Sequence, residues 1–232
     1  MSSTGRAVSA AMLHRLAFEF RPMRSRLPHP DERSAQTTYD LLVDVDGVLY
    51  PFPEEFTTYL SGRLGRELRL DTTSWEFYEA WGIDADSFVD LLAAGVGARA
   101  LWWEGAPYPE VGRSVRRLRE AGHRLHLVTA REVAGAEAAM EATLHWLSAH
   151  DLEVESVNLA LDKPTVLGRL GLDPSGCIAV DDAPHLVEAW EGAGVHSVVL
   201  DRWRSYRGTH RAVPDLAAFA DLVEERSRNS RA

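Results

Sequence analysis

The chain has 232 residues, a formal net charge of −10 and one cysteine, Cys177. This length suits one sizeable domain or a domain with an insert, and the single cysteine excludes an intramolecular disulfide and a cysteine-rich metal site. The acidic balance argues against non-specific binding of nucleic acid, which needs a basic face, so we expect no polynucleotide partner.

The sequence contains no recognisable membrane or secretory segment. No apolar run reaches the ~18 residues that a membrane span needs, and the start of the chain lacks the continuous apolar centre of a secretory signal. A single cysteine also suits a reducing compartment. We therefore expect a cytoplasmic protein with no membrane partner, and the sequence leaves its oligomeric state open.

From residue 39 onward, predicted strands and helices alternate along the chain. Residues 1–38, with a short helix predicted near residues 8–20, are expected to be an N-terminal extension that is flexible and outside the core. Apolar runs predict five strands, at residues 39–45, 123–130, 154–161, 177–182 and 196–201. Helical spacing predicts helices with the faces Val111, Val115 and Leu118; Met140, Leu144 and Leu147; and Leu186, Val187 and Trp190. This alternation predicts an α/β fold with a mainly parallel, five-stranded sheet.

The stretch between the first two strands is about 75 residues long, far more than one crossover helix needs. Its pattern predicts three helical segments: one through Phe56, Leu60 and Leu64, one with a Thr73–Glu76 capping box that ends at Gly82, and one that starts near Asp86. We expect residues 51–105 to form a small helical insert after the first strand, over the strand ends. Residues 106–121 then form the crossover helix, with Gly122 as its C-cap, and the core comprises residues 39–50 and 106–232.

Polar residues with reactive side chains follow three of the predicted strands. Asp44 and Asp46 end the first strand, Thr129 ends the second, and Asp181 and Asp182 end the fourth. Ligands of open α/β sheets bind beyond the carboxyl ends of the strands. We therefore expect these side chains to converge on one site.

Such a cluster suits phosphoryl chemistry at a metal ion. Close carboxylates repel each other unless a cation joins them, and Mg²⁺ prefers oxygen ligands. One carboxylate can attack phosphorus, and a second can transfer protons to the leaving oxygen and from water. A hydroxyl and an ammonium can hold the phosphoryl oxygens. The chain has a single lysine for this purpose, Lys163, beside 24 arginines.

The segments DVDGVLY, VTAR, DKPT and VDD occur in this order and in these strand and helix contexts. Together they resemble the four motifs of the haloacid dehalogenase superfamily of phosphohydrolases, over residues 39–205. The resemblance implies a Rossmann-like core of three layers, with the insert of residues 51–105 as the cap that selects the substrate. It also implies these roles: Asp44 as the nucleophile, Asp46 as the general acid and base, Thr129 with the backbone amide of Ala130 as the phosphoryl ligands, and Lys163 as the stabiliser of nucleophile and phosphate.

The resemblance also implies a Mg²⁺ cofactor. Its ligands would be Asp44, the main-chain carbonyl of Asp46, Asp181 and Asp182, with the direct ligand among the last two left open. Superfamily members that hydrolyse phosphate esters have an acid at the position of Asp46, whereas ion transporters have threonine and dehalogenases lack the acid. The resemblance therefore implies a Mg²⁺-dependent phosphomonoester hydrolase that acts through phospho-Asp44.

Finer features are similar to the deoxyribonucleotidase-like branch of this superfamily, namely WEFYEAWGID, GHRLHLVTAR and LDRWRSYR. In that branch, aromatic residues of the cap stack on the nucleotide base. The corresponding candidates are Phe52, Trp75, Trp102 and Trp103. Independently of the resemblance, Arg131 is a candidate for a contact to phosphate or base. The chain departs from the branch by having Ala-Arg after Thr129. The implied partner is a small phosphorylated substrate, a nucleoside 5′- or 3′-monophosphate.

Other interpretations stay open at this point. The enzyme could act on sugar phosphates or another small metabolite, or on polynucleotide ends, which the acidic body disfavours. The chain could also be a non-catalytic binding protein, although a binder has no need of Asp46. Asp181 and Asp182 could cap the helix that follows them, the tryptophans could be core packing, and Arg131 could belong to a solvated surface.

Overall fold

The computed structural model of the chain describes residues 37–229. The extension predicted for residues 1–38, including the helix near residues 8–20, lies outside these residues except for Thr37 and Thr38.

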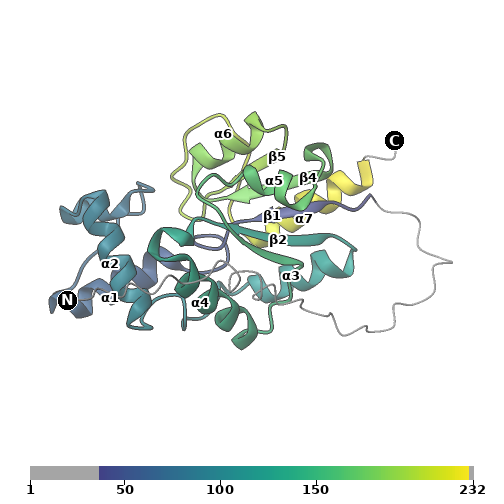
Figure 1. Cartoon of the computed structure of the whole chain (residues 1–232). Coiled ribbons are helices and arrows are strands. Elements are labelled where there is room, and N and C mark those ends of the chain that lie inside the picture. Colours follow the sequence, from purple (N-terminus) through teal and green to yellow (C-terminus); the bar gives the residue numbers. More distant parts are fainter. Residues whose placement is uncertain (1–36, 230–232) are drawn as a thin grey trace, which may run out of the picture. The chain divides into compact units, whose positions relative to one another are not determined.

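The centre of the fold is a parallel sheet of six strands (Figure 1). The strands are β1 Asp40–Val43, β2 Arg124–Thr129, β3 Ser156–Leu159, β4 Cys177–Asp181, β5 His196–Leu200 and β6 Ala212–Val213. Each of the five predicted apolar runs contains one strand, which confirms the α/β class and the parallel sheet. The predicted number of strands was short by one, because β6 has two residues and no periodic pattern.

The strand order β3-β2-β1-β4-β5-β6 places β1 at the centre, paired with β2 on one side and with β4 on the other. The chain builds the sheet outward from β1 to β3 and then returns to build β4 to β6 in the other direction. The reversal lies between β1 and β4, and in open α/β sheets a crevice forms there beyond the carboxyl ends of the strands. The fold therefore favours a site where β1 and β4 end.

Helices cover both faces of the sheet and complete the three layers (Figure 1). They are α3 Val111–Glu120, α4 Ala136–Ala149, α5 Thr165–Leu170, α6 Pro184–Gly192 and α7 Leu216–Asn229. Alternate residues of β1 point to opposite faces, since Leu41 and Val43 pack with α3, α4 and α7, whereas Leu42 packs with α5 and α6. Among residues 37–229, no helix is long and apolar enough to cross a membrane.

The face predicted for α4 is partly wrong. Leu147 is buried as expected, but Leu144 is 50% exposed. The helix instead buries Ala139, Ala142, Thr143, Trp146 and Leu147. Trp146 fixes this orientation, because its indole donates a hydrogen bond to the carbonyl of Gly105 at 2.8 Å.

Residues 51–105, called the helical insert below, lie between β1 and α3. They contain α1 Phe52–Leu64, the 3₁₀ helix η1 Phe77–Trp81 and α2 Ala85–Gly97. The predicted capping box is wrong: the Thr73 hydroxyl donates to Asp71 at 2.6 Å, and the backbone first turns helical at Phe77. The predicted end at Gly82 is confirmed, with a left-handed φ of 75°.

Candidate active site

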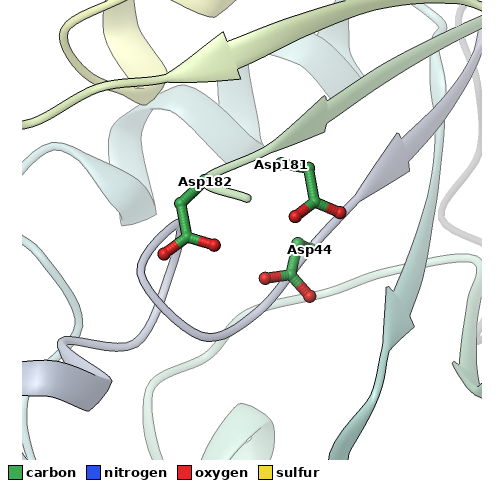
Figure 2. A group of neighbouring side chains, drawn as sticks. All are labelled: Asp44, Asp181 and Asp182. Atoms are coloured by element: carbon green, nitrogen blue, oxygen red, sulfur yellow. The ribbon is translucent and has the colours of Figure 1, made fainter. Parts of the chain in front are cut away.

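Three carboxylates meet where β1 and β4 end. Asp44 follows β1, while Asp181 ends β4 and Asp182 comes directly after it. Val43 pairs with Val180 in the parallel ladder, so the next residues of the two strands lie side by side. One oxygen from each of the three aspartates lies within 4.8 Å of the others, and Figure 2 shows the carboxylates facing a common space. The predicted convergence of these strand ends is therefore seen in the fold.

Lys163 joins two of these carboxylates from the turn before α5. Its Nζ donates hydrogen bonds to Asp44 Oδ1 at 2.7 Å and to Asp181 Oδ2 at 2.6 Å, and its side chain is 2% exposed. Burial lowers the pKa of Lys163, but Asp181 and Asp44 outweigh this effect and hold the pKa above its ordinary value. Lys163 is thus a buried ammonium that is paired with two carboxylates. We call these four residues (Asp44, Lys163, Asp181 and Asp182) the strand-end cluster.

The strand-end cluster carries more negative than positive charge. Burial raises the pKa of Asp44 to about 7, although Lys163 acts in the opposite direction. Burial and the nearby Asp44 and Asp181 raise the pKa of Asp182 well above its ordinary value. An added cation relieves such repulsion, and an all-oxygen donor set suits a hard divalent ion. The residues present therefore fit Mg²⁺.

A glycine lets the loop after β1 run against Asp182. Gly47 has a left-handed φ of 76°, and a Cβ on it would lie 2.0 Å from Asp182 Oδ2. Arg202, which follows β5, holds the same loop by donating to the carbonyls of Gly47 at 3.0 Å and Val48 at 2.6 Å. The third contact of Arg202 is a hydrogen bond to Glu110 at 2.8 Å. The loop is thus held by residues that follow β4 and β5.

Asp46 lies on this loop and has a partner that the sequence does not reveal. Its two carboxylate oxygens accept hydrogen bonds from Arg131 Nε at 2.9 Å and from Arg131 Nη2 at 2.8 Å. Arg131 is 1% exposed, so its assignment to a solvated surface is wrong. Its remaining Nη1 donates to Thr143 at 2.9 Å, so each of its three side-chain nitrogens has a partner within the chain.

A cavity of ≈ 270 Å³ opens above the strand-end cluster. Its polar part is formed by Asp44, Asp46, Thr129, Ala130, Arg131, Lys163, Asp181 and Asp182. The aromatic residues that the helical insert contributes are Phe52, Trp75, Phe77, Tyr78, Phe88 and Trp102. We call five of these (Phe52, Phe77, Tyr78, Phe88 and Trp102) the insert wall. The cavity thus combines a charged part from the sheet with an aromatic part from the helical insert.

One predicted site residue does not line this cavity. The Trp103 indole donates a hydrogen bond to the carbonyl of Val96 at 3.2 Å and packs against Arg99. Its neighbour Trp102 does line the cavity and has a left-handed φ of 68°. The predicted capping role of Asp181 and Asp182 is not seen either, since the N-cap of α6 is Ala183, without a side-chain cap.

Sequence reasoning did not single out Trp203, which lines this cavity and a neighbouring one of ≈ 230 Å³. The two cavities also share Trp75 and Asp182. Trp203 follows β5 at the same edge of the sheet as Asp44. The rule that ligands bind beyond strand ends, applied to the fifth predicted strand, would have identified it.

Comparisons with known proteins find solved structures with a similar fold. Solved structures similar to the chain include a predicted phosphatase from Clostridium acetobutylicum, with 14% identity, a TM-score of 0.56, and coverage of 81% of this chain and 99% of that one. CbbY from Rhodobacter sphaeroides, in complex with xylulose-1,5-bisphosphate, has 20% identity, a TM-score of 0.52, and coverage of 78% and 95%. A defluorinating L-2-haloacid dehalogenase has 12% identity, a TM-score of 0.55, and coverage of 80% and 95%.

These similarities show a shared fold. No curated protein matches the chain. The family model of the haloacid dehalogenase-like hydrolases matches residues 40–194, which contain the strand-end cluster and more than half of the chain. The chain therefore belongs to the haloacid dehalogenase-like hydrolase family.

Proposed function

We propose that the protein is a Mg²⁺-dependent phosphomonoester hydrolase that acts through phospho-Asp44. The observation that carries this proposal is the position of Lys163, which bridges Asp44 and Asp181 at the base of a cavity that Asp46 also lines. A phosphoryl group in this cavity would meet a carboxylate nucleophile, a cation and a second carboxylate for proton transfer.

Within this proposal, Asp44, Asp181, Asp182 and the main-chain carbonyl of Asp46 hold the metal. When bound, Mg²⁺ supplies positive charge to the phosphoryl oxygens and offsets the charge of the carboxylates. The raised pKa values of Asp44 and Asp182 are consistent with this assignment, because burial and the neighbouring carboxylates both disfavour the charged forms and a bound cation would favour them.

The reaction then has two displacement steps. In the first, a carboxylate oxygen of Asp44 forms a bond to phosphorus, the bond from phosphorus to the ester oxygen breaks, and Asp46 gives its proton to that oxygen. In the second, Asp46 takes a proton from water while the water oxygen bonds to phosphorus and the acyl-phosphate bond breaks. Free alcohol and inorganic phosphate are released, and both carboxylates return to their starting states. Thr129, the Ala130 amide and Lys163 hold the phosphoryl oxygens.

The presence of Asp46 in the cavity favours phosphate esters over halides. A halide ion leaves without a proton, whereas an alkoxide is a poor leaving group unless an acid protonates it. A dehalogenase is the second candidate function, because one of the similar structures is a dehalogenase. Asp46 would have no role in the departure of a halide.

We further propose that residues 51–105 form a cap over the core, residues 39–50 and 106–232, and select a nucleoside monophosphate. The insert wall supports this substrate class, since its aromatic side chains can stack on a planar base. Phosphorylated sugars are the rival class, as CbbY has been solved with xylulose-1,5-bisphosphate. A sugar presents hydroxyl groups, with which the three phenylalanine rings of the wall cannot form hydrogen bonds.

The proposal is tested by phosphate release from a panel of nucleoside monophosphates, sugar phosphates and para-nitrophenyl phosphate with Mg²⁺, beside halide release from 2-haloacids. We expect turnover of phosphate esters, with nucleotides best, and a loss of at least ~10³-fold in Asp44→Asn. Asp151→Asn is the matched control, because this exposed residue has a left-handed φ of 53° that asparagine tolerates. Turnover of sugar phosphates alone would keep the mechanism and overturn the substrate class. Halide release without phosphate release would overturn both.

Metal binding has a readout that does not depend on activity. Mg²⁺ should raise the midpoint of thermal unfolding of the wild type by binding the folded state. The shift should disappear in Asp181→Asn and persist in Asp151→Asn. An equal shift in all three proteins would contradict the proposed ligands.

A further inference from the structure

The pairing of Asp46 with Arg131 is the feature that the proposed reaction leaves unexplained. The guanidinium forms two parallel hydrogen bonds to the carboxylate and a third to the Thr143 hydroxyl. It also lies over two aromatic rings, with its central carbon 4.6 Å from the Trp102 ring centroid and 5.2 Å from that of Tyr50. Arg131 is thus held by a carboxylate, a hydroxyl and two aromatic rings of this chain.

This arrangement favours a role on Asp46 over the predicted contact from Arg131 to the substrate. Each side-chain nitrogen is already bonded within the chain, and the side chain has no exposed surface. The bonds to Asp46 and Thr143 use three of the five N–H donors of the guanidinium, and release of Asp46 would leave a buried charge without its partner, which is strongly unfavourable. Arg131 therefore acts on Asp46.

The paired hydrogen bonds constrain how the carboxylate is turned. A free aspartate rotates broadly about its last side-chain bond, whereas a guanidinium fork fixes the plane of the carboxylate. A carboxylate offers about four acceptor positions, and the fork uses one on each oxygen. The Asp46 side chain is 21% exposed and lines the cavity. Acceptor positions of its carboxylate therefore remain for a proton on the cavity side.

We propose that Arg131 is a positioning residue that orients the Asp46 carboxylate toward the ester oxygen of the substrate, and that Thr143 and Trp102 hold Arg131 in place. The inference rests on the proposed phosphatase function. Trp102 belongs to the helical insert, and its backbone amide donates to the Tyr50 hydroxyl at 3.2 Å. Its left-handed φ of 68° is a strained conformation that persists where surrounding contacts fix it. The contact with Trp102 thus connects the insert to the orientation of Asp46.

The role predicts a specific dependence on the leaving group. Para-nitrophenolate leaves readily without a proton, whereas an alkoxide needs the proton of Asp46 as its bond to phosphorus breaks. Disorienting Asp46 should therefore slow an alkyl phosphate much more than para-nitrophenyl phosphate. A residue that only supports the fold would slow both substrates by the same factor.

The test compares kcat/KM of wild type and Arg131→Lys on para-nitrophenyl phosphate and on the alkyl phosphate of the panel with the highest turnover. Lysine keeps the positive charge but cannot form the two parallel hydrogen bonds of the guanidinium. We expect a fall of about 10²-fold on the alkyl phosphate and of less than about tenfold on para-nitrophenyl phosphate. Arg117→Lys is the matched control, because Arg117 forms the same fork with Glu224, at 2.6 and 2.7 Å, between α3 and α7. Arg117→Lys should leave the ratio of kcat/KM between the two substrates unchanged.

Thr143→Val provides a second, milder variant in case Arg131→Lys does not fold. It removes one hydrogen bond to Arg131 at nearly constant volume. The ratio of kcat/KM between the two substrates should therefore change in the same direction, by about fivefold. Thr143→Ser, which keeps the hydroxyl, should lie closer to the wild type. Equal falls on both substrates in the folded variants would overturn the inference and leave the phosphatase intact. Absence of any phosphate release from the wild type would instead overturn the proposed function, and the inference with it.

Discussion

The strand-end cluster and the insert wall line the same cavity, but different forces hold them. The cluster is charged, and hydrogen bonds of 2.6 and 2.7 Å join Lys163 to its carboxylates. The insert wall is aromatic, and its ring centroids lie from 4.3 Å (Tyr78 and Phe88) to 6.5 Å apart (Phe52 and Trp102). Interplanar angles within the wall range from 20° to 88°.

This difference has a consequence for tolerance to substitution. Short bonds between buried charges depend on both partners, and removal of one leaves the other unpaired. Ring packing depends mainly on shape and volume, so volume-conserving changes cost little. We expect the cluster to be intolerant of change and the wall to be adjustable, which suits a division between reaction and substrate selection.

The largest effect is expected for Lys163→Met. Its loss leaves Asp44 and Asp181 buried beside each other without their cation, so the free energy of unfolding should fall by about 3–5 kcal/mol. Urea unfolding at pH 8 in the presence of EDTA measures this change. Adding Asp44→Asn to Lys163→Met should restore part of the stability. If Lys163→Met is as stable as the wild type, the strand-end cluster tolerates substitution as well as the insert wall does.

A smaller effect is expected for Gly47→Ala, with Gly65→Ala as its control. Both glycines have left-handed φ values, 76° and 63°, so alanine should cost each protein about 1–2 kcal/mol of stability. A Cβ at Gly47 also displaces the Asp182 carboxylate, whereas one at Gly65 meets no atom within 4 Å. Calorimetric titration should show Mg²⁺ affinity about tenfold weaker in Gly47→Ala alone. Equal Mg²⁺ affinities in the two variants would contradict the assignment of Asp182 as a metal ligand.

The smallest effect is expected for Phe52→Leu, with Phe56→Leu as its pair on α1. Phe52 lines the cavity, while Phe56 is fully buried beside it, with 5.6 Å between the ring centroids. Loss of the Phe52 ring should raise KM for the preferred nucleotide about fivefold, because stacking on it is worth about 1 kcal/mol. Phe56→Leu should lower stability by about 1 kcal/mol and leave KM unchanged. A raised KM in Phe56→Leu with an unchanged KM in Phe52→Leu would contradict a role of the insert wall in substrate selection.

The two regions also differ in how far the sequence predicts them. A buried apolar run that ends in aspartate identifies a strand end, so the placement of Asp44, Asp181 and Asp182 follows once the sheet is parallel. The insert offers no such rule. Trp102 and Trp103 are adjacent in sequence, and the left-handed backbone at Trp102 accompanies a geometry in which only Trp102 lines the cavity.

Three other features were missed for different physical reasons. Asp46 and Arg131 are 85 residues apart, and neither segment indicates the pairing. The buried face of α4 consists largely of alanines, which give a weak apolar signal beside Leu144. At Thr73, the nearby Asp71 accepts the hydroxyl hydrogen bond that the capping box would have used.

The uniqueness of Lys163 has a practical consequence. Because it is the only lysine of the chain, feeding ¹⁵N-labelled lysine to the expressing cells labels one side-chain amine and one backbone amide in the protein. The amine resonance would come from the group that bridges Asp44 and Asp181, without any substitution or attached probe. Its chemical shift would report metal binding, substrate binding and phosphorylation of Asp44 as separate events. The protein therefore contains its own single-site spectroscopic label at the centre of the candidate active site.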